Sequence, residues 1–152
     1  MIKTVNGYRF TEEGGLALVD IRVDSVAEAL GQLREQYSCQ GWRDIIPIMS
    51  AVQTVLDNFE LIEVVDAKGT SLMAYSAETP WFTGESILVE EFVVGEADLS
   101  SVVHAMSALA KIHGCSRLVL GTRAVRGAKH SALARLYERT GCVVSCMELT
   151  KE

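Results

Sequence analysis

The sequence lacks any long apolar run. No stretch approaches the roughly 20 consecutive apolar residues that a membrane-spanning helix needs, so we expect no membrane segment. The opening residues, MIKTVNGYRFTEEGG, contain no apolar stretch of the kind found in a secretion signal. We therefore expect a cytoplasmic protein.

Paired cysteines and a basic surplus are also missing. No two cysteines form a CxxC pair, so the sequence predicts neither a zinc site nor a redox motif, and we expect reduced thiols that serve packing. The cysteines are Cys39, Cys115, Cys142 and Cys146. Fourteen Lys and Arg against 20 Asp and Glu give a net charge of −6. This balance disfavours nucleic-acid binding, because such a surface is normally basic.

Several catalytic signatures are absent as well. HExxH, GxSxG and P-loop motifs do not occur, which disfavours a metalloprotease, a serine hydrolase and an NTPase. No cluster of metal ligands is visible, so we expect no metal. What remains is a chain of 152 residues, 49% hydrophobic and 22% charged. Without repeats or linkers, it reads as one globular domain spanning residues 1–152.

The most informative stretch is a strand that carries two acids. Ile87–Val94 is apolar and β-branched except for Glu90 and Glu91. Carboxylates in the middle of a core strand are costly to bury unless they are paired, hydrated or used. Because strand side chains alternate, the two acids point to opposite faces. One of them therefore faces any pocket beside this strand; Glu91 is slightly preferred.

A helix and a second strand follow directly. Asp98 is a good N-cap, the helix runs to His113, and Gly114 closes it. The chain re-emerges as a strand over Arg117–Gly121. Strands joined through a helix in this way lie parallel with a right-handed crossover.

Five elements are predicted before this unit by alternation or helical spacing. They are the strand Leu16–Val23, a helix opened by the capping box Ser25 to Glu28, a helix beginning near Asp44 with Pro47 in its first turn, and the strands Leu61–Ala67 and Ser71–Ala77. The second helix is expected to bury one stripe of side chains. That stripe is Ile45, Met49, Val52, Leu56 and Phe59.

The loop Thr79–Glu85 contains two large rings, Trp81 and Phe82. The simpler interpretation is that these rings anchor the loop on the core. The alternative is that they form a wall of a substrate pocket.

After the central unit come a basic loop, a helix and a final strand. Their expected ranges are Thr122–Lys129, His130–Thr140 closed by Gly141, and Cys142–Thr150. The resulting order, β-α-α-β-β-β-α-β-α-β, predicts an α/β fold with a mixed sheet and helices on both faces.

Two local motifs carry a resemblance to a known family. Ala134-Arg-Leu-Tyr-Glu-Arg-Thr-Gly-Cys142 is similar to the penultimate helix of the GCN5-related N-acetyltransferase (GNAT) family, and Val89-Glu-Glu-Phe-Val-Val94 to its fourth strand. The predicted element order also resembles this family over nearly the whole chain. The chain would be a compact, divergent member, and a phage origin is one hypothesis for its source.

The resemblance implies acetyl-CoA as cofactor and an amine as acceptor. Acetyl-CoA would lie between the strands Ile87–Val94 and Arg117–Gly121. The expected cofactor-binding residues are Phe92, Val93, Val94, Ser100, Ser101, Arg123, Arg126 and His130. Backbone N–H groups of Val93 and Val94 would polarise the acetyl carbonyl at a strand bulge. The simpler interpretation of the basic residues is a solvated loop.

The resemblance also implies the catalytic residues. Glu91 or Glu90 would accept the proton of the amine, and Tyr137 would protonate the leaving thiolate. The structural alternative places one glutamate in an ion pair, leaves the other solvated, and has Tyr137 pack its ring in the core with its hydroxyl at the rim.

Three hypotheses for function follow. The first is an acetyl-CoA-dependent N-acetyltransferase acting on a small molecule or a protein. The second is a GNAT-fold protein that binds a host protein partner with little or no catalysis. It arises because the turn Val94–Ser101 has one glycine, no Arg or Gln, and the two acids Glu96 and Asp98, where the family's phosphate loop would lie. The third is a virion or assembly component.

Overall fold

The computed structural model describes residues 3–39, 46–121 and 135–143. The helices and strands are β1 (Thr4–Thr11), β2 (Gly15–Arg22), α1 (Val23–Cys39), α2 (Ile48–Asn58), β3 (Glu60–Asp66), β4 (Gly69–Glu78), β5 (Ile87–Gly95), α3 (Leu99–His113) and β6 (Arg117–Val119). A short helical turn covers residues 135–139. Every described helix is too short or too polar to span a bilayer.

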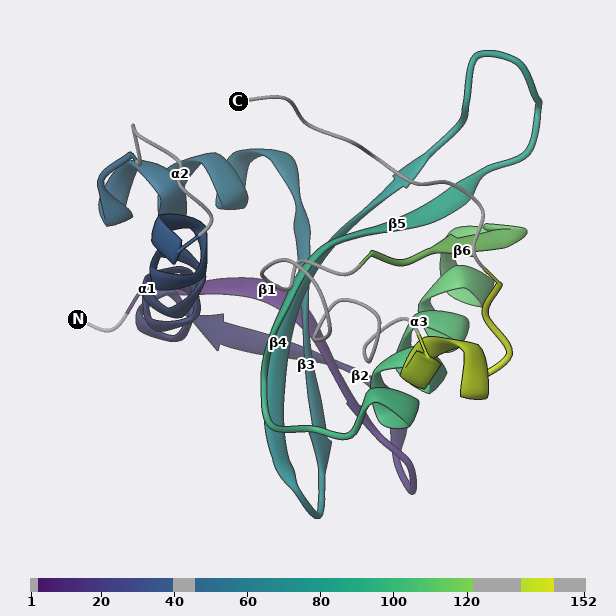
Figure 1. Cartoon of the computed structure of the whole chain (residues 1–152), viewed down its shortest axis with the longest axis horizontal. Helices are drawn as coiled ribbons and strands as arrows, with labels where there is room; N and C mark the ends of the chain where they lie inside the picture. The colour runs from purple at the N-terminus through teal and green to yellow at the C-terminus, as the bar shows by residue number, and fades with distance from the viewer. Residues whose placement is uncertain (1–2, 40–45, 122–134, 144–152) are drawn as a thin grey trace.

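The strands form one six-stranded sheet in the order β2-β1-β3-β4-β5-β6 (Figure 1). The pairs β1–β3 and β5–β6 are parallel, and the other three neighbouring pairs are antiparallel. The predicted α/β class with a mixed sheet is therefore confirmed. β5, α3 and β6 form the expected parallel crossover unit.

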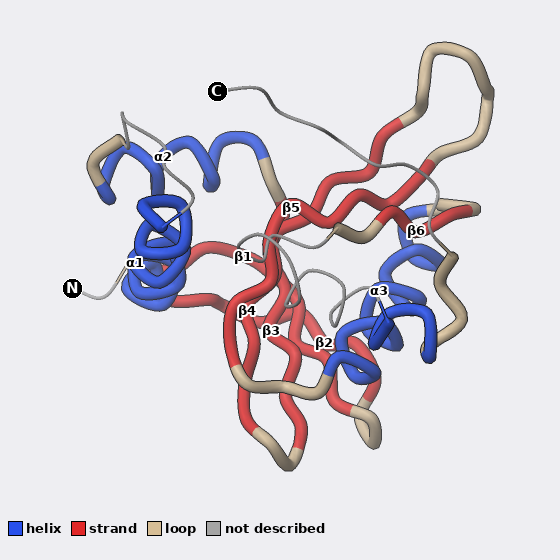
Figure 2. Tube along the Cα trace, in the orientation of Figure 1, coloured by secondary structure: helices blue, strands red, loops and turns tan. Residues whose placement is uncertain are grey.

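Helices cover both faces of the sheet (Figure 2), as predicted. On one face α1 and α2 pack on inward side chains such as Leu72, Ala74 and Phe92. On the other face α3 packs on Met73, Tyr75 and their neighbours. Adjacent β4 residues thus belong to different cores, which is the alternation that a doubly covered strand requires.

The first strand was not among the predicted elements, and its presence corrects the predicted order. β1 lies inside the sheet between β2 and β3. Gly7 interrupts its apolar pattern, and a Cβ at that position would overlap the Ile21 side chain and the Leu61 carbonyl. Close packing therefore requires a glycine at this position, and this glycine makes the strand hard to recognise in the sequence.

Two helix starts differ from prediction. α1 begins at Val23, directly after β2, so Ser25 lies inside the helix and the proposed capping box is wrong. α2 begins at Ile48 with Pro47 as its N-cap residue, and Met49 is 68% exposed rather than buried. Val55 is buried instead, because the face of α2 turned to the core is the one that carries Ile48, Val52 and Val55 at helical spacing.

The ends of α3 follow the sequence closely. Asp98 occupies the N-cap position, and Gly114 adopts the left-handed conformation with φ of +68° at the C-terminus. Gly141 also has a positive φ, +97°, after the short helical turn. β6 ends at Val119, two residues earlier than predicted. The beginning of the predicted helix His130–Thr140 and residues 144–150 of the predicted last strand lie outside the described residues.

The β4–β5 hairpin extends well beyond the rest of the sheet (Figure 1). Its tip contains Trp81 and Phe82, which are 95% and 73% exposed. Their rings contact each other edge to face, with centroids 5.5 Å apart. The expectation that these rings anchor the loop on the core is therefore wrong, because the tip reaches past the core.

Candidate functional site

The site begins where β5 and β6 separate. Their parallel ladder ends at the pair Val89–Val119. One residue further along β5, the Glu90 Oε2 atom accepts a hydrogen bond from the backbone N–H of Gly121 at 3.1 Å. At the point of separation, a side-chain hydrogen bond thus replaces the backbone hydrogen bonds between the two strands. Beyond this point the edge of β5 borders a gap.

A β-bulge in β5 decides which acid faces this gap. Ala74 of β4 lies opposite Phe92, and Tyr75 lies opposite Glu90, so Glu91 is the extra residue of the bulge. Leu88 packs in the core beneath α3, whereas Phe92 and Val94 belong to the core beneath α1 and α2. The bulge therefore reverses which face of the sheet the even-numbered side chains of β5 point to.

Glu90 lines the cavity, and Glu91 is not among the residues around it. This is the opposite of the preference drawn from sequence, because simple alternation along the strand takes no account of the bulge. The bulge also lies at Glu91 rather than at Val93 and Val94, where the resemblance implied one.

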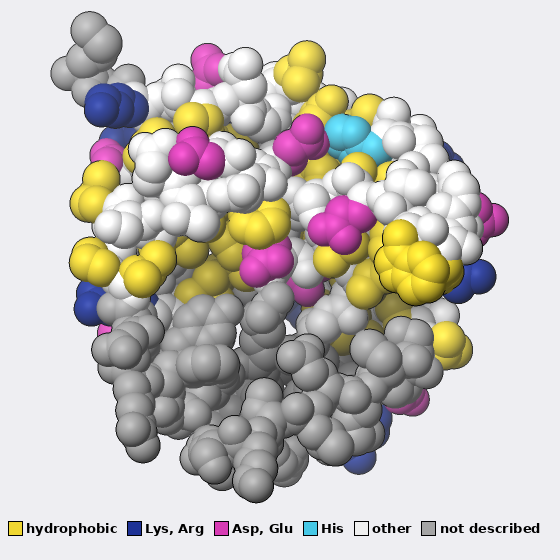
Figure 3. All heavy atoms as spheres, turned by 90° about the horizontal axis from the view of Figure 1, so that it is seen from above, with side chains coloured by type: hydrophobic (Ala, Val, Ile, Leu, Met, Phe, Trp, Pro, Cys, Tyr) yellow, Lys and Arg dark blue, Asp and Glu magenta, His cyan; other side chains and the backbone are white. Residues whose placement is uncertain are grey.

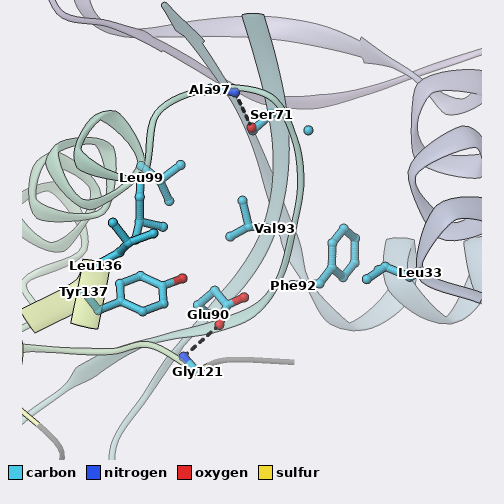
Figure 4. A pocket seen from close by; sticks show the side chains of 12 residues that line it. Leu33, Ser71, Glu90, Phe92, Val93, Ala97, Leu99, Gly121, Leu136 and Tyr137 are labelled. Atoms are coloured by element: carbon cyan, nitrogen blue, oxygen red, sulfur yellow. Dashed lines mark hydrogen bonds between the residues drawn. The ribbon is translucent and has the colours of Figure 1, made fainter. Parts of the chain in front are cut away.

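The gap is a cavity of about 270 Å³ between β5, α3 and the helical turn 135–139 (Figure 4). Its wall is mostly apolar, and Glu90, Tyr137 and Ser71 supply its polar side chains. The lining residues are Leu33, Ser71, Glu90, Phe92, Val93, Gly95, Ala97, Leu99, Val102, Gly121, Leu136 and Tyr137. Apolar walls with a few placed polar groups are typical of small-molecule sites.

Tyr137 points its hydroxyl into this cavity from the helical turn, toward the end where Glu90 lies (Figure 4). Burial of the ring and the nearby charge of Glu90 raise the pKa of Tyr137 well above its usual range. The phenol therefore stays protonated at neutral pH. One cavity thus contains a buried carboxylate, which can accept a proton, and a protonated phenol, which can donate one.

At the other end of the cavity lies the turn between β5 and α3. Three consecutive backbone N–H groups in this turn already donate within the protein. Glu96 N–H donates to Thr70 O at 3.3 Å, and Ala97 N–H donates to Ser71 Oγ at 3.0 Å. Asp98 N–H donates to Asp66 Oδ2 at 2.7 Å.

Asp66 organises this turn from the end of β3. Its carboxylate also accepts hydrogen bonds from the Ser101 hydroxyl at 2.8 Å and from the backbone N–H groups of Lys68 and Gly69 at 2.8 and 3.2 Å. These donors, led by Asp98 N–H, hold the pKa of Asp66 below its usual range. Asp98 makes no side-chain cap; its carboxylate pairs with Lys68 Nζ at 3.2 Å instead.

The predicted cofactor-binding residues divide into four groups by their place in the structure. Phe92 and Val93 line the cavity, whereas Val94 is buried in the core beneath α1 and α2. The two serines face the turn: Ser100 Oγ donates to Asp98 Oδ2 at 3.2 Å, and Ser101 donates to Asp66. Arg123, Arg126 and His130 lie outside the described residues.

Sequence reasoning missed Ser71, Asp66 and Gly121. Asp66 falls near the end of the predicted strand Leu61–Ala67, and its partner Asp98 lies 32 residues further along the chain. Among the described residues, no three His, Cys, Asp or Glu side chains are grouped so as to hold a metal ion.

The comparison with solved structures identifies the fold. A crystal structure of a GNAT family acetyltransferase from Staphylococcus aureus subsp. aureus USA300_TCH1516 matches with a TM-score of 0.51 and 13% sequence identity, over 100% of this chain and 99% of that one. This protein has the GNAT fold. No protein-family profile matches the sequence, and no curated protein matches it. In this GNAT fold, Glu90 of β5 and Tyr137 of the helical turn line one cavity next to the point where β5 and β6 separate.

Proposed function

We propose that this protein is an N-acetyltransferase that moves an acetyl group from acetyl-CoA to an amine. The observation that carries the proposal is the placement of Glu90 and Tyr137 in one cavity, at the point where β5 and β6 separate. The GNAT fold supports the same class of reaction by analogy.

In this proposal the two side chains divide the proton transfers. The neutral amine nitrogen bonds to the acyl carbon while the carbon–sulfur bond breaks. Glu90, directly or through a water, accepts the proton that the amine loses, and Tyr137 donates its hydroxyl proton to the departing sulfur. Proton return from Glu90 to Tyr137 restores both groups, so the net products are an amide and a thiol.

The shape of the cavity supports a thioester arm as its occupant. Val93, Leu99 and Leu136 provide an apolar wall between the Glu90 end and the Ala97 end (Figure 4). Beyond Val89 the β5 edge no longer pairs with β6. An extended chain containing amides can bond such an edge as an added strand does. Val93 would then offer its backbone to the acetyl carbonyl.

The test is acetyl transfer by the whole chain to a panel of small amines and lysine peptides, followed by mass spectrometry of the products. Calorimetric titration with acetyl-CoA, with free CoA alongside, measures binding separately. We expect an acetylated product that the double variant Glu90→Gln, Tyr137→Phe does not form. Absence of both binding and product with the wild type would overturn the proposal.

A second candidate function is binding of a protein partner with little catalysis. The observation that favours it is the exposed ring pair Trp81 and Phe82 on the extended hairpin. Figure 3 views this end of the molecule and shows apolar side chains at its surface, interspersed with acidic ones. Large exposed rings are common anchors in protein interfaces. A partner that binds the Tyr137→Phe variant but not the Trp81→Ala variant would support this function.

A further inference from the structure

The turn before α3 opens onto the cavity at Ala97 and Leu99. A helix N-terminus that follows a strand is a ready site for a phosphate group, because its first N–H groups point outward. The helix α3 begins at Leu99, and the three N–H groups that precede it, those of Glu96, Ala97 and Asp98, are bound to Thr70 O, Ser71 Oγ and Asp66 Oδ2. A diphosphate that bound these three N–H groups would have to displace acceptors that belong to the protein.

The charge around this turn opposes a diphosphate as well. Asp66 places a carboxylate directly on the N–H of Asp98, and its four donors keep it ionised at neutral pH. Glu96 and Asp98 lie in the turn itself. Among the described residues, Lys68 is the cation bonded there, and it is already paired with Asp98. A second anion brought beside these carboxylates would be repelled.

The remainder of the cavity has the opposite character. Between the Ala97 end and the Glu90 end its wall is apolar. The edge of β5 that no longer pairs with β6 runs along this wall. These features suit the pantetheine arm of a thioester, which carries two amides and methyl groups but no charge. The described residues around the cavity and the turn therefore fit one half of acetyl-CoA and do not fit its diphosphate.

We propose that the acyl donor is recognised through its pantetheine arm and that the turn before α3 gives no recognition of a diphosphate. The substrate class is acyl thioesters of pantetheine, with or without a nucleotide attached. This inference rests on the proposed acetyl transfer. It departs from that proposal by predicting that the nucleotide half of CoA is dispensable.

The experiment compares S-acetyl-pantetheine with acetyl-CoA as donors at a saturating amine concentration. We expect kcat/KM values within about tenfold of each other, because a single charge-assisted hydrogen bond to phosphate is already worth about tenfold or more. Adenosine 3′,5′-bisphosphate, which represents the nucleotide half, should not inhibit, whereas free pantetheine should compete with either donor.

A preference for acetyl-CoA of about 100-fold or more, with inhibition by adenosine 3′,5′-bisphosphate, would overturn this inference and leave acetyl transfer intact. Failure of both donors to react or bind would overturn acetyl transfer itself. The two failures are therefore distinguishable from the same set of measurements.

Ser71→Ala tests the turn directly. The substitution removes the acceptor of the Ala97 N–H and exposes that N–H to the cavity. We expect the preference for acetyl-CoA over S-acetyl-pantetheine to rise severalfold, whereas Ser76→Ala, the same change on β4 at a hydroxyl bound to Glu78, leaves the ratio unchanged. Equal ratios in wild type and Ser71→Ala would count against the role of the turn. If Ser71→Ala does not fold, the wild-type donor ratio still decides.

Discussion

Glu90 and Gly121 are joined by a side chain to backbone hydrogen bond of 3.1 Å across the point where two parallel strands separate. The bond fixes the carboxylate beside the cavity and at the same time ties the end of β6 to β5. Replacement of Glu90 therefore has a structural and a chemical consequence, and the choice of substitution separates them.

Glu90→Gln should abolish most activity while the fold survives. The amide oxygen of glutamine still accepts the Gly121 N–H, but it does not accept a proton from an amine. Loss of a general base typically lowers kcat by about 10² to 10⁴-fold. Steady-state kinetics together with a thermal melt measure the two effects. Glu91→Gln is the matched control, because Glu91 does not line the cavity; inactivity of the control with full activity of Glu90→Gln would refute the assignment.

Tyr137→Phe should slow transfer most when the departing thiol is a poor leaving group. The variant keeps the buried ring and loses only the proton donor, so we expect a loss of about 10²-fold or more with acetyl-CoA. With an aryl thioester, whose thiolate leaves without help, the loss should shrink markedly. Tyr8→Phe, a change on β1 away from the cavity, controls for the removal of a hydroxyl. An equal loss with both thioesters would mean that Tyr137 acts only through packing.

The unit from β5 to β6 could be predicted from sequence because its signals are local. A β-branched strand, Asp98, an apolar helix and Gly114 each carry their own pattern, and the structure confirms their positions. The two-sided sheet followed from the same local signals, since hairpins and crossovers were both visible. The elements that have a local sequence pattern could therefore be predicted from the sequence.

The remainder depended on contacts between distant segments. The bulge at Glu91 is defined by the β4 register, so no inspection of β5 alone reveals which acid faces the cavity. The Asp66 carboxylate bonds to a turn 32 residues away. Trp81 is exposed because the β4–β5 hairpin extends past the core, and the sequence composition does not indicate how far a hairpin extends. Each missed feature is a tertiary one.

Asp66→Ala should destabilise the protein, and the loss should depend on pH. The lowered pKa means that the folded state favours the charged carboxylate, so Asp66 contributes stability above its ordinary pKa of 3.8 and loses that contribution as the pH falls below it. Wild type and variant should therefore differ in unfolding midpoint at neutral pH and converge in strong acid. Asp57→Ala on the exposed face of α2 is the control. A pH-independent difference would assign the effect to packing.

Alkaline pH should destabilise the wild type through Tyr75. The ring is fully buried, and its hydroxyl meets His113 Nε2 at 3.2 Å. Burial, followed by the charge of Glu60, raises its pKa far above the ordinary 10.0. Above pH 10 the unfolded chain therefore loses a proton that the folded chain retains, which favours unfolding. Urea titrations from pH 8 to about 11 should show a smaller decline in Tyr75→Phe than in wild type. Identical slopes would contradict the assignment.

Two glycine substitutions should shift stability in opposite directions. Gly7→Ala places a methyl group against the Ile21 side chain and the Leu61 carbonyl, inside a sheet that leaves no room for it. Overpacking of this kind typically costs about 1–3 kcal/mol. Gly31 lies within α1 with nothing within 4 Å of an added Cβ. Gly31→Ala should therefore stabilise the protein by about 0.5–1 kcal/mol, because alanine loses less backbone entropy than glycine in a helix. Urea unfolding of both variants measures the difference. A neutral Gly7→Ala would mean that β1 does not lie against β2 and β3 as described, since only that close approach makes the glycine necessary.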